Sequence, residues 1–180
     1  MASTLKINNL DTATGTTITI PTGKTLVGTD TATVRSPGTV LQVVNGPGNV
    51  ARIQSSATSY TDTPITATIT PKATSSKILV NWSTGCLSPD NNYLYFRLMC
   101  AIGGGSQALV NTNEDHTILD GYDEANWEQI GHGALHSPHT TSSCVYTLQA
   151  KSAAGPWYVG WSNDADNKNM MDITLMEIAQ

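Results

Sequence analysis

The sequence predicts an all-β fold: an antiparallel β-sandwich or jelly roll that follows an extended β-rich leader. Short runs of alternating or β-branched apolar residues recur along the chain, and clusters of Gly, Pro and Asn separate them. Apolar residues at helical spacing are almost missing between these runs. Strands joined by turns, without intervening helices, are typical of antiparallel sandwiches and jelly rolls.

The chain changes in character near residue 38. The residues before this point are rich in threonine and poor in apolar side chains, whereas the later residues alternate between apolar and polar runs. A chain of 180 residues is long enough for one domain and an extension. We therefore divide it into a leader at residues 1–37 and a β-sandwich module at residues 38–180, which is large enough to bury a core.

The leader is expected to become ordered only through neighbouring chains. Its apolar residues are too sparse for a core of their own, although residues 17–20 alternate like a strand that Pro21 ends. Short alternating segments can interleave with copies of themselves about an axis or dock on a partner, and a flexible tail is the alternative. The residues expected to anchor the leader are Leu5, Ile7, Leu10, Ile18 and Ile20.

Four strands are predicted in the first half of the module. Each is a run of β-branched or aromatic residues between turn residues, and they lie at residues 39–44, 65–69, 77–82 and 93–102. The fourth run holds Arg97 as its only charge and ends in Gly103-Gly104-Gly105. Three glycines at this position predict a hairpin or a bulge.

Three further strands are predicted at residues 144–150, 157–161 and 172–178. The last of them carries apolar residues on both faces, which predicts covered faces and a central or interface position in its sheet. Residues 120–130 begin with acidic side chains, contain Gly121 and lack an apolar stripe. We expect this segment to form a loop with at most a short turn.

Composition excludes several classes of function. Lys and Arg number 9 against 14 Asp and Glu, so the net charge is −5 and nucleic-acid binding is not expected. The chain begins without a secretion signal, and no apolar stretch approaches the roughly 20 residues that cross a bilayer, so membrane insertion is not expected either. Cys86, Cys100 and Cys144 are expected to be buried free thiols, which fits synthesis in a reducing cytoplasm.

Two segments contain the residue types of metal sites. His132 and His136 would lie about 13 Å apart on one strand, at a rise of about 3.3 Å per residue, which is too far to chelate one ion. We expect them, with His139, to be exposed loop residues, although an ion on a trimer axis stays open. Residues 163–169 resemble a calcium loop, but Lys168 occupies a ligand position, so we expect a polar turn and no cofactor.

No catalytic pattern stands out, and we predict a protein that is not an enzyme. Two carboxylates could hydrolyse a glycoside if they were held about 5 to 9.5 Å apart across a cleft, but nothing in the spacing of the acidic residues between Glu114 and Glu128 fixes such a pair, and a solvated acidic loop is expected. The nucleophile elbow, the phosphate-binding loop and the zinc-binding H-E-x-x-H pattern are absent from the sequence.

Aromatic residues are the remaining candidates for binding. Trp82, Trp157 and Trp161 lie in predicted strands, so we expect them in the core or in an interface. Other aromatic and polar residues lie in the acidic segment, where loops commonly contact ligands. The residues proposed for contact with a receptor are Asp115, His116, Tyr122 and Trp127.

Several strings resemble one group of viral proteins. The opening MASTLKINNL, the stretch TGTTITIPTG, and the later runs PGTVLQVV, ITPKATSSKILV, YFRLM, LHSPHTTSSCVYTLQAKS and ITLMEI occur here in order. They resemble tail-fibre-like proteins of bacteriophages, especially marine and cyanobacterial ones. The family tends to have acidic or small residues where this chain has His136 and His139.

The resemblance implies a virion protein that is made in the host cytoplasm. Its module would be a jelly-roll-like sandwich that assembles as a homotrimer, and its leader would bind a phage tail or capsid protein. The expected function is that of a short tail fibre whose module contacts a host cell-surface glycan or protein. A capsid decoration or head-fibre protein and a glycan-degrading enzyme of the virion are the alternatives.

Overall fold

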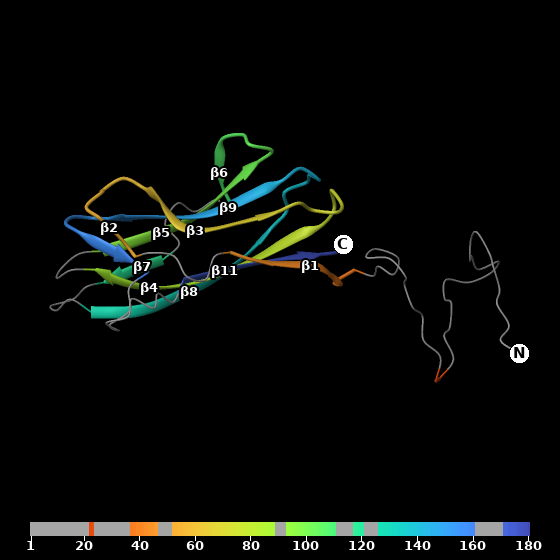
Figure 1. Ribbon diagram of the computed structural model, residues 1–180, viewed down its shortest axis with the longest axis horizontal. Coiled ribbons are helices and arrows are strands. Elements are labelled where there is room, and N and C mark those ends of the chain that lie inside the picture. Colours follow the sequence, from red (N-terminus) through yellow and green to blue (C-terminus); the bar gives the residue numbers. More distant parts are fainter. Residues whose placement is uncertain are drawn as a thin grey trace, which may run out of the picture. The chain divides into compact units, whose positions relative to one another are not determined.

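The computed structural model describes residues 22–23, 37–46, 52–88, 93–110, 117–120, 126–160 and 171–180 (Figure 1). Every regular element among them is a β-strand, so the predicted all-β class is confirmed. The chain divides into two units, residues 1–34 and 35–180, and the strands belong to the second. Residues 17–20, where a strand is predicted, and the five anchoring residues lie outside the described residues. The predicted boundary at residue 37 borders on them. All of these stay predictions.

One sheet, which we call the β4 sheet, is built around the long strand β4. On one side, β4 pairs along most of its length with β8. On the other side it pairs with β11 and then with β10, and β1 and β2 extend the sheet beyond these two. Its strands are β1 (Val40–Asn45), β2 (Ile53–Ser55), β4 (Lys77–Ser88), β8 (Asn126–His136), β10 (Trp157–Val159) and β11 (Met171–Ile178).

The second sheet, the β5 sheet, faces the first in Figure 1. Strand β9 lies between β3 and β5, and β7 and β6 pair with successive parts of the free side of β5. Every pairing in both sheets is antiparallel. The strands are β3 (Thr61–Ile69), β5 (Tyr93–Ile102), β6 (Gln107–Leu109), β7 (Thr117–Asp120) and β9 (Cys144–Ser152).

The strand order is that of a jelly roll. Three pairs of short strands share one position each, namely β1 with β2, β6 with β7, and β10 with β11. If each of these pairs is counted as one strand, the described residues form eight strands, which can be numbered along the chain. Neighbours in the β4 sheet are then strands one, eight, three and six, and neighbours in the β5 sheet are strands two, seven, four and five. This is the double Greek-key arrangement of a jelly roll. The predicted jelly-roll-like sandwich is confirmed.

The core fills the space between the two sheets. Alternate residues of each strand point inward, as the period of two requires. Phe96, Tyr146 and Trp157 are fully buried, and the Trp82 ring lies 5.5 Å from that of Phe96. Trp82 and Trp157 are therefore core residues, as predicted, whereas Trp161 lies outside the described residues.

All seven strands predicted in the module are present, and four others were not predicted. Strands β2, β6 and β7 are short, and β8 begins inside the segment predicted as a loop. That part of the prediction is wrong from Asn126 onward, because pairing with β4 overrides the weak strand propensity of the segment. His132 and His136 consequently lie in β8 and not in a loop.

Two glycines let β8 approach β4 closely. A Cβ atom on Gly131 would lie 2.8 Å from the Trp82 carbonyl oxygen, and one on Gly133 would lie 2.8 Å from Oδ1 of Asn81. At the β5–β6 connection, Gly103 and Gly104 have φ of 59° and 77°. Glycine adopts these angles without strain, and the hairpin predicted there is confirmed.

The last strand occupies a central position, as predicted. Strand β11 pairs with β1 on one side and with β4 on the other. Ile173 and Leu175 on its inner face are buried, while Met176 and Ile178 on its outer face are half-buried. The outer face is therefore only partly covered.

The three cysteines are buried free thiols, as predicted. Burial, with a smaller contribution from the Glu128 carboxylate, raises the pKa of Cys86 to about 12. Burial likewise raises the pKa of Cys100 to about 12. Since the thiolate is the reactive form, these thiols are unreactive at neutral pH. Within the described ranges, the structure contains no helix of the length and apolar character that a membrane span requires.

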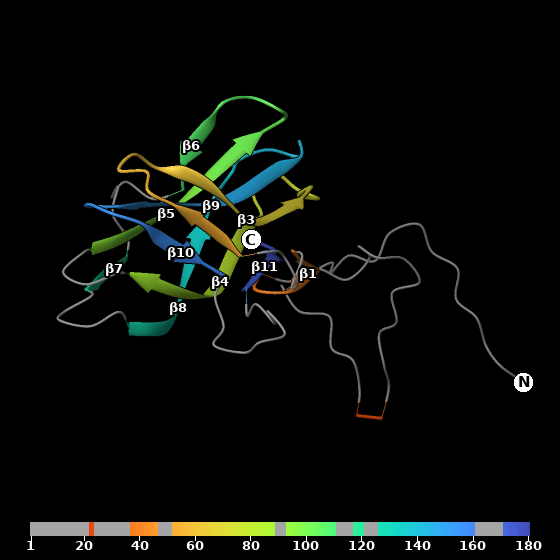
Figure 2. The same ribbon diagram turned by 60° about the vertical axis from the view of Figure 1, so that its left-hand side comes forward.

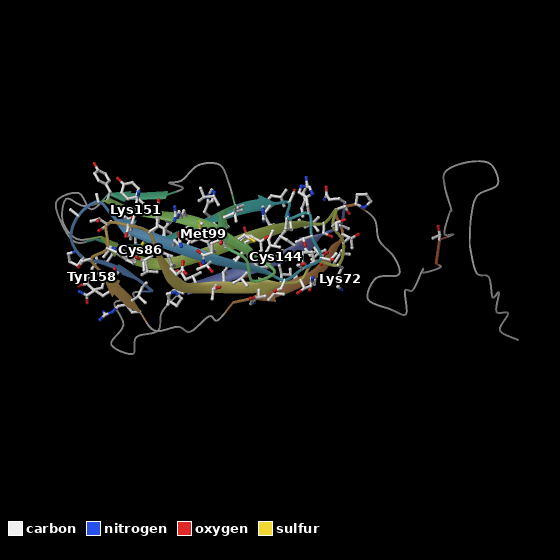
Figure 3. All side chains as sticks on the ribbon, turned by 90° about the horizontal axis from the view of Figure 1, so that it is seen from above. Lys72, Cys86, Met99, Cys144, Lys151 and Tyr158 are labelled. Atoms are coloured by element: carbon white, nitrogen blue, oxygen red, sulfur yellow. The ribbon has the colours of Figure 1, made fainter. Side chains whose placement is uncertain are left out.

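The sandwich has two distinct ends. At the first, the terminal end, the chain enters at Pro37 and finishes at Gln180. Here the Gly38 amide donates to the Ala179 carbonyl (2.8 Å) and the Ala179 amide to the Thr39 carbonyl (2.9 Å). The opposite end, the far end, carries residues 56–60 and the turn at 153–156. Lys72 marks the terminal end in Figure 3, and Lys151 and Tyr158 lie toward the far end.

Candidate functional site

A group of tyrosines and cations lies on the outer face of the β5 sheet, toward the far end. We call Tyr60, Tyr93, Tyr95, Arg97 and Lys151 the tyrosine–cation cluster. Tyr93 is 43% exposed, and the other four side chains are half-buried. This combination of accessible aromatic rings and positive charge makes the cluster the candidate functional site.

The strand period places the cluster on one face. In β5, Leu94 and Phe96 point into the core, so Tyr95 and Arg97 point outward. Lys151 of β9 lies directly opposite Tyr95, and Tyr60 immediately precedes β3. Residues from three separate parts of the chain therefore meet on this face.

The cations lie against the tyrosine rings. The Arg97 guanidinium carbon is 4.0 Å from the centre of the Tyr60 ring. Lys151 Nζ is 4.5 Å from the same ring centre and 4.9 Å from that of Tyr95. The Tyr95 ring lies 6.3 Å from Tyr93, tilted by 40°. These distances are those of cation–π contacts, which hold both charges at the sheet surface.

Hydrogen bonds between side chains fix the orientation of Arg97. Its Nε donates to Oε1 of Gln149 (2.6 Å), and Gln149 Nε2 donates to Oδ1 of Asp62 (2.6 Å) and to Oε1 of Gln107 (2.9 Å). Gln107 Nε2 donates in turn to the other Asp62 oxygen (3.2 Å). The Asp62 carboxylate is thus held by amide groups, and no described carboxylate forms an ion pair with Arg97.

The middle of the same face is covered. Met99 and Thr147 also point away from the core, yet they are only 7% and 6% exposed. Strand β6 pairs beside Met99, and Figure 1 shows it rising away from the rest of the sheet. The far-end part of the face, where the cluster lies, is more accessible than this middle part.

The arrangement is suited to binding. It offers two cations, aromatic rings and an amide network, and this is the chemistry of polar ligand recognition. In the part of the chain that the structure describes, no group of three or more His, Cys, Asp or Glu residues is placed to hold a metal ion.

The structure places one of the four residues predicted for receptor contact. Trp127 belongs to β8, where its backbone pairs with Leu87, so the prediction that it lies in a loop is wrong. Asp115, His116 and Tyr122 lie outside the described residues, as does the calcium-like segment 163–169. The contact role of all four stays a prediction. Strand β7 ends at Asp120, opposite Tyr93.

The sequence contained part of the signal for the cluster. Alternation in the run 93–102 places Tyr93, Tyr95 and Arg97 on one face, and the charge of Arg97 marks that face as the outer one. Tyr60 and Lys151 give no such signal, because only strand pairing brings them to β5. The cluster was therefore missed.

His136 has a structural role. The hydroxyl of Tyr146 lies 2.8 Å from its Nδ1, and the two rings meet edge to face at 5.7 Å. Burial, and to a smaller extent the charge of His139, lower the pKa of His136 below its ordinary value of 6.5. The folded state favours the neutral ring, so the stability it contributes is present above pH 6.5 and lost as the pH falls below it.

A small pocket lies at the terminal end. Its volume is about 90 Å³, well below the roughly 300 Å³ of a typical ligand site. The Ser76 hydroxyl, which is buried and has no hydrogen-bond partner, belongs to its lining. The lining residues are Pro37, Leu41, Ala73, Ser75, Ser76, Ala179 and Gln180. The pocket is too small for a sugar or a peptide.

Comparisons with known proteins give distant similarity only. No family model matches the chain, and no curated protein matches it. Over 85% of its length it is similar to 42% of a chain in the structure of infectious bursal disease virus Gx strain, with a TM-score of 0.41 and 10% identity. Over 85% of its length it is also similar to 41% of a chain in the crystal structure of the infectious bursal disease virus VP2 subviral particle, with a TM-score of 0.38 and 10% identity.

This chain spans less than half the length of those proteins. At these TM-scores the similarity supports no conclusion about the function of this chain.

Proposed function

We propose that this protein is a virion structural protein, a short homotrimeric phage fibre. In this proposal the leader attaches the protein to the particle, and the far end of the sandwich touches the host surface. One observation carries the proposal. The chain enters and leaves the sandwich at the terminal end, while the tyrosine–cation cluster lies toward the opposite end (Figure 3). The resemblance of the sequence to phage tail-fibre-like proteins supports the same orientation.

The mechanism is multivalent binding. A single cluster offers few contacts, so its affinity for a surface group is expected to be weak. Three copies on one fibre present three clusters at a high effective concentration, which raises the overall affinity without any new contact. In this way a small sandwich can attach to a cell through surface contacts that are weak one by one.

Exposed apolar side chains on two edge strands support self-association. Val40 and Val43 of β1 are 49% and 55% exposed, and Leu135 of β8 is 52% exposed. β1 and β8 are outer strands of the β4 sheet, so each also has an unpaired backbone edge among the described residues. Proteins usually protect such edges, and contacts between subunits of a trimer would do so here.

Deletion of residues 1–35 tests the role of the leader. The remaining chain keeps every described strand and the bonds of Gly38 and Thr39 to Ala179, so we expect a folded module with little change in melting temperature. We expect it to be absent from purified particles, as measured by quantitative mass spectrometry. A deletion variant that enters particles at the normal level would refute the anchoring role.

A further inference from the structure

We propose that the outer face of the β4 sheet packs against further copies of this chain, and that the β1 side of one subunit meets the β8 side of the next. This inference rests on the proposed function, because it names the surface through which the proposed homotrimer assembles. The contact is centred on four side chains that we call the apolar row, namely Val43, Met176, Leu79 and Leu135.

The strand register places the four side chains of the apolar row next to one another. Val43 of β1 lies opposite Met176 of β11, and Met176 lies opposite Leu79 of β4. Leu79 in turn lies opposite Leu135 of β8. Because side chains alternate between the two faces of a sheet and Leu175 beside Met176 belongs to the core, the row points outward. It therefore runs from one edge strand of the sheet to the other.

The apolar row is accessible where it reaches the edges of the sheet. Val43 and Leu135 are more than half exposed, while Met176 and Leu79 between them are half-buried. Val40, which is about half exposed, continues the apolar surface toward the terminal end. A group of neighbouring exposed apolar side chains, unlike a single one, is typical of a contact surface between proteins.

The next row of the same face, toward the far end, is polar. Asn45 of β1 lies opposite Thr174, and Thr174 lies opposite Asn81 of β4. Gly133 of β8 completes this second row. The Thr174 hydroxyl donates to Oδ1 of Asn45 (3.2 Å), so these two polar groups satisfy each other. An apolar centre with a polar border is the usual composition of a protein–protein interface.

The position of the apolar row favours a second copy of this chain as its occupant. Val40 lies three residues after Pro37, where the leader joins the sandwich, and Figure 2 shows β1 and β11 side by side near the C-terminus. In the proposed fibre three leaders attach together, so they hold three such surfaces at a high effective concentration. A host molecule would meet the far end instead. The tyrosine–cation cluster lies on the other sheet and stays outside the contact.

The two ends of the apolar row predict a heterologous contact, in which two different surfaces meet. β1 and β8 are opposite edge strands of the β4 sheet, and each has an unpaired backbone edge among the described residues. A contact that joins one of these edges to the other repeats around an axis and, in the proposed homotrimer, closes after three copies. It then protects both edges in every subunit.

A disulfide cross-link in the full-length protein tests this arrangement. In a chain that carries both Val43→Cys and Leu135→Cys, we expect oxidation to join neighbouring subunits into covalent trimers on a non-reducing gel. Within one subunit the two positions are three strand spacings apart, about 14 Å, which is beyond the reach of a disulfide. The native cysteines are buried and do not compete. Val40→Cys with Leu135→Cys is the second pair.

The matched control combines Val43→Cys with Ile102→Cys, an exposed position of the β5 sheet. We expect this pair to give no covalent trimers. A charge in the apolar row gives an independent measurement: Val43→Lys should raise the concentration at which trimers dissociate at least tenfold in analytical ultracentrifugation. Ile102→Lys, the same kind of change outside the row, should leave that concentration unchanged. Circular dichroism shows that each variant is folded.

Three results would overturn the proposal. The first is a trimer in which neither cysteine pair cross-links, and the second is a covalent dimer as the end product, which indicates a two-fold contact. The third is a folded Val43→Lys protein that forms trimers as tightly as the unchanged protein. If that variant is then missing from particles, the row contacts a particle protein instead. An unchanged protein that is monomeric in solution would contradict the proposed homotrimer itself, so the two failures are distinct.

Discussion

Leu175→Asp is expected to leave no folded protein. Leu175 is fully buried in the central strand β11, between Val44 of β1 and Val80 of β4. The substitution removes a core side chain and places a carboxylate within the cluster of buried apolar residues. We expect a cost of at least about 5 kcal/mol, comparable with the whole stability of a domain of this kind. Circular dichroism and solubility measure the loss.

The control for this substitution is Leu135→Asp, which makes the same chemical change on an exposed strand position. Its effect on the stability of a single subunit should stay within about 1 kcal/mol. A Leu175→Asp protein that melts like the unchanged protein would mean that β11 is not central. Loss of trimers in the Leu135→Asp variant, without loss of folding, would place β8 in the subunit interface.

Glu177→Ala is expected to loosen the terminal end. The Glu177 carboxylate is fully buried, and it accepts hydrogen bonds from the Lys72 backbone amide (2.7 Å) and from Nε2 of Gln42 (2.6 Å). The Gln42 amide also donates to the Thr70 carbonyl (2.8 Å). One carboxylate thus joins β11, β1 and the loop after β3. Its removal leaves two donors without this acceptor, and we expect a loss of about 3 to 5 kcal/mol.

Chemical denaturation measures this effect and separates it from a general effect of charge. Glu177→Gln keeps an acceptor for the Lys72 amide, so it should recover a large part of the loss. Glu128→Ala, on an exposed position of β8, should change stability by less than about 0.5 kcal/mol. Equal stability of Glu177→Ala and Glu128→Ala would show that the buried carboxylate does not join the three segments.

Strands with a strong local signal could be predicted from the sequence. The run 93–102 has β-branched, aromatic and apolar residues and ends in three glycines, and it coincides with β5 (Tyr93–Ile102). Residues 126–136 lacked such a signal, because two glycines and two histidines interrupt the pattern. Their strand depends on pairing with β4, a segment about 50 residues earlier, and local propensity does not contain that information.

The candidate site illustrates the same limit. Alternation assigns Tyr95 and Arg97 to one face, yet their partners Tyr60 and Lys151 become neighbours only through the order of β3, β9 and β5. The buried carboxylate of Glu177 was also unexpected, because an acidic residue in an apolar strand usually marks an exposed face. Its two hydrogen-bond partners come from segments more than 100 residues away in the sequence.

Electron microscopy of intact particles tests the central claim most directly, since it shows where the sandwich sits and which end points outward. Our account predicts density for three sandwiches around an axis, with Pro37 and Ala179 toward the particle and with Arg97 and Lys151 toward the solvent. Sandwiches attached to the particle through the tyrosine–cation cluster, or particles without this chain, would contradict it.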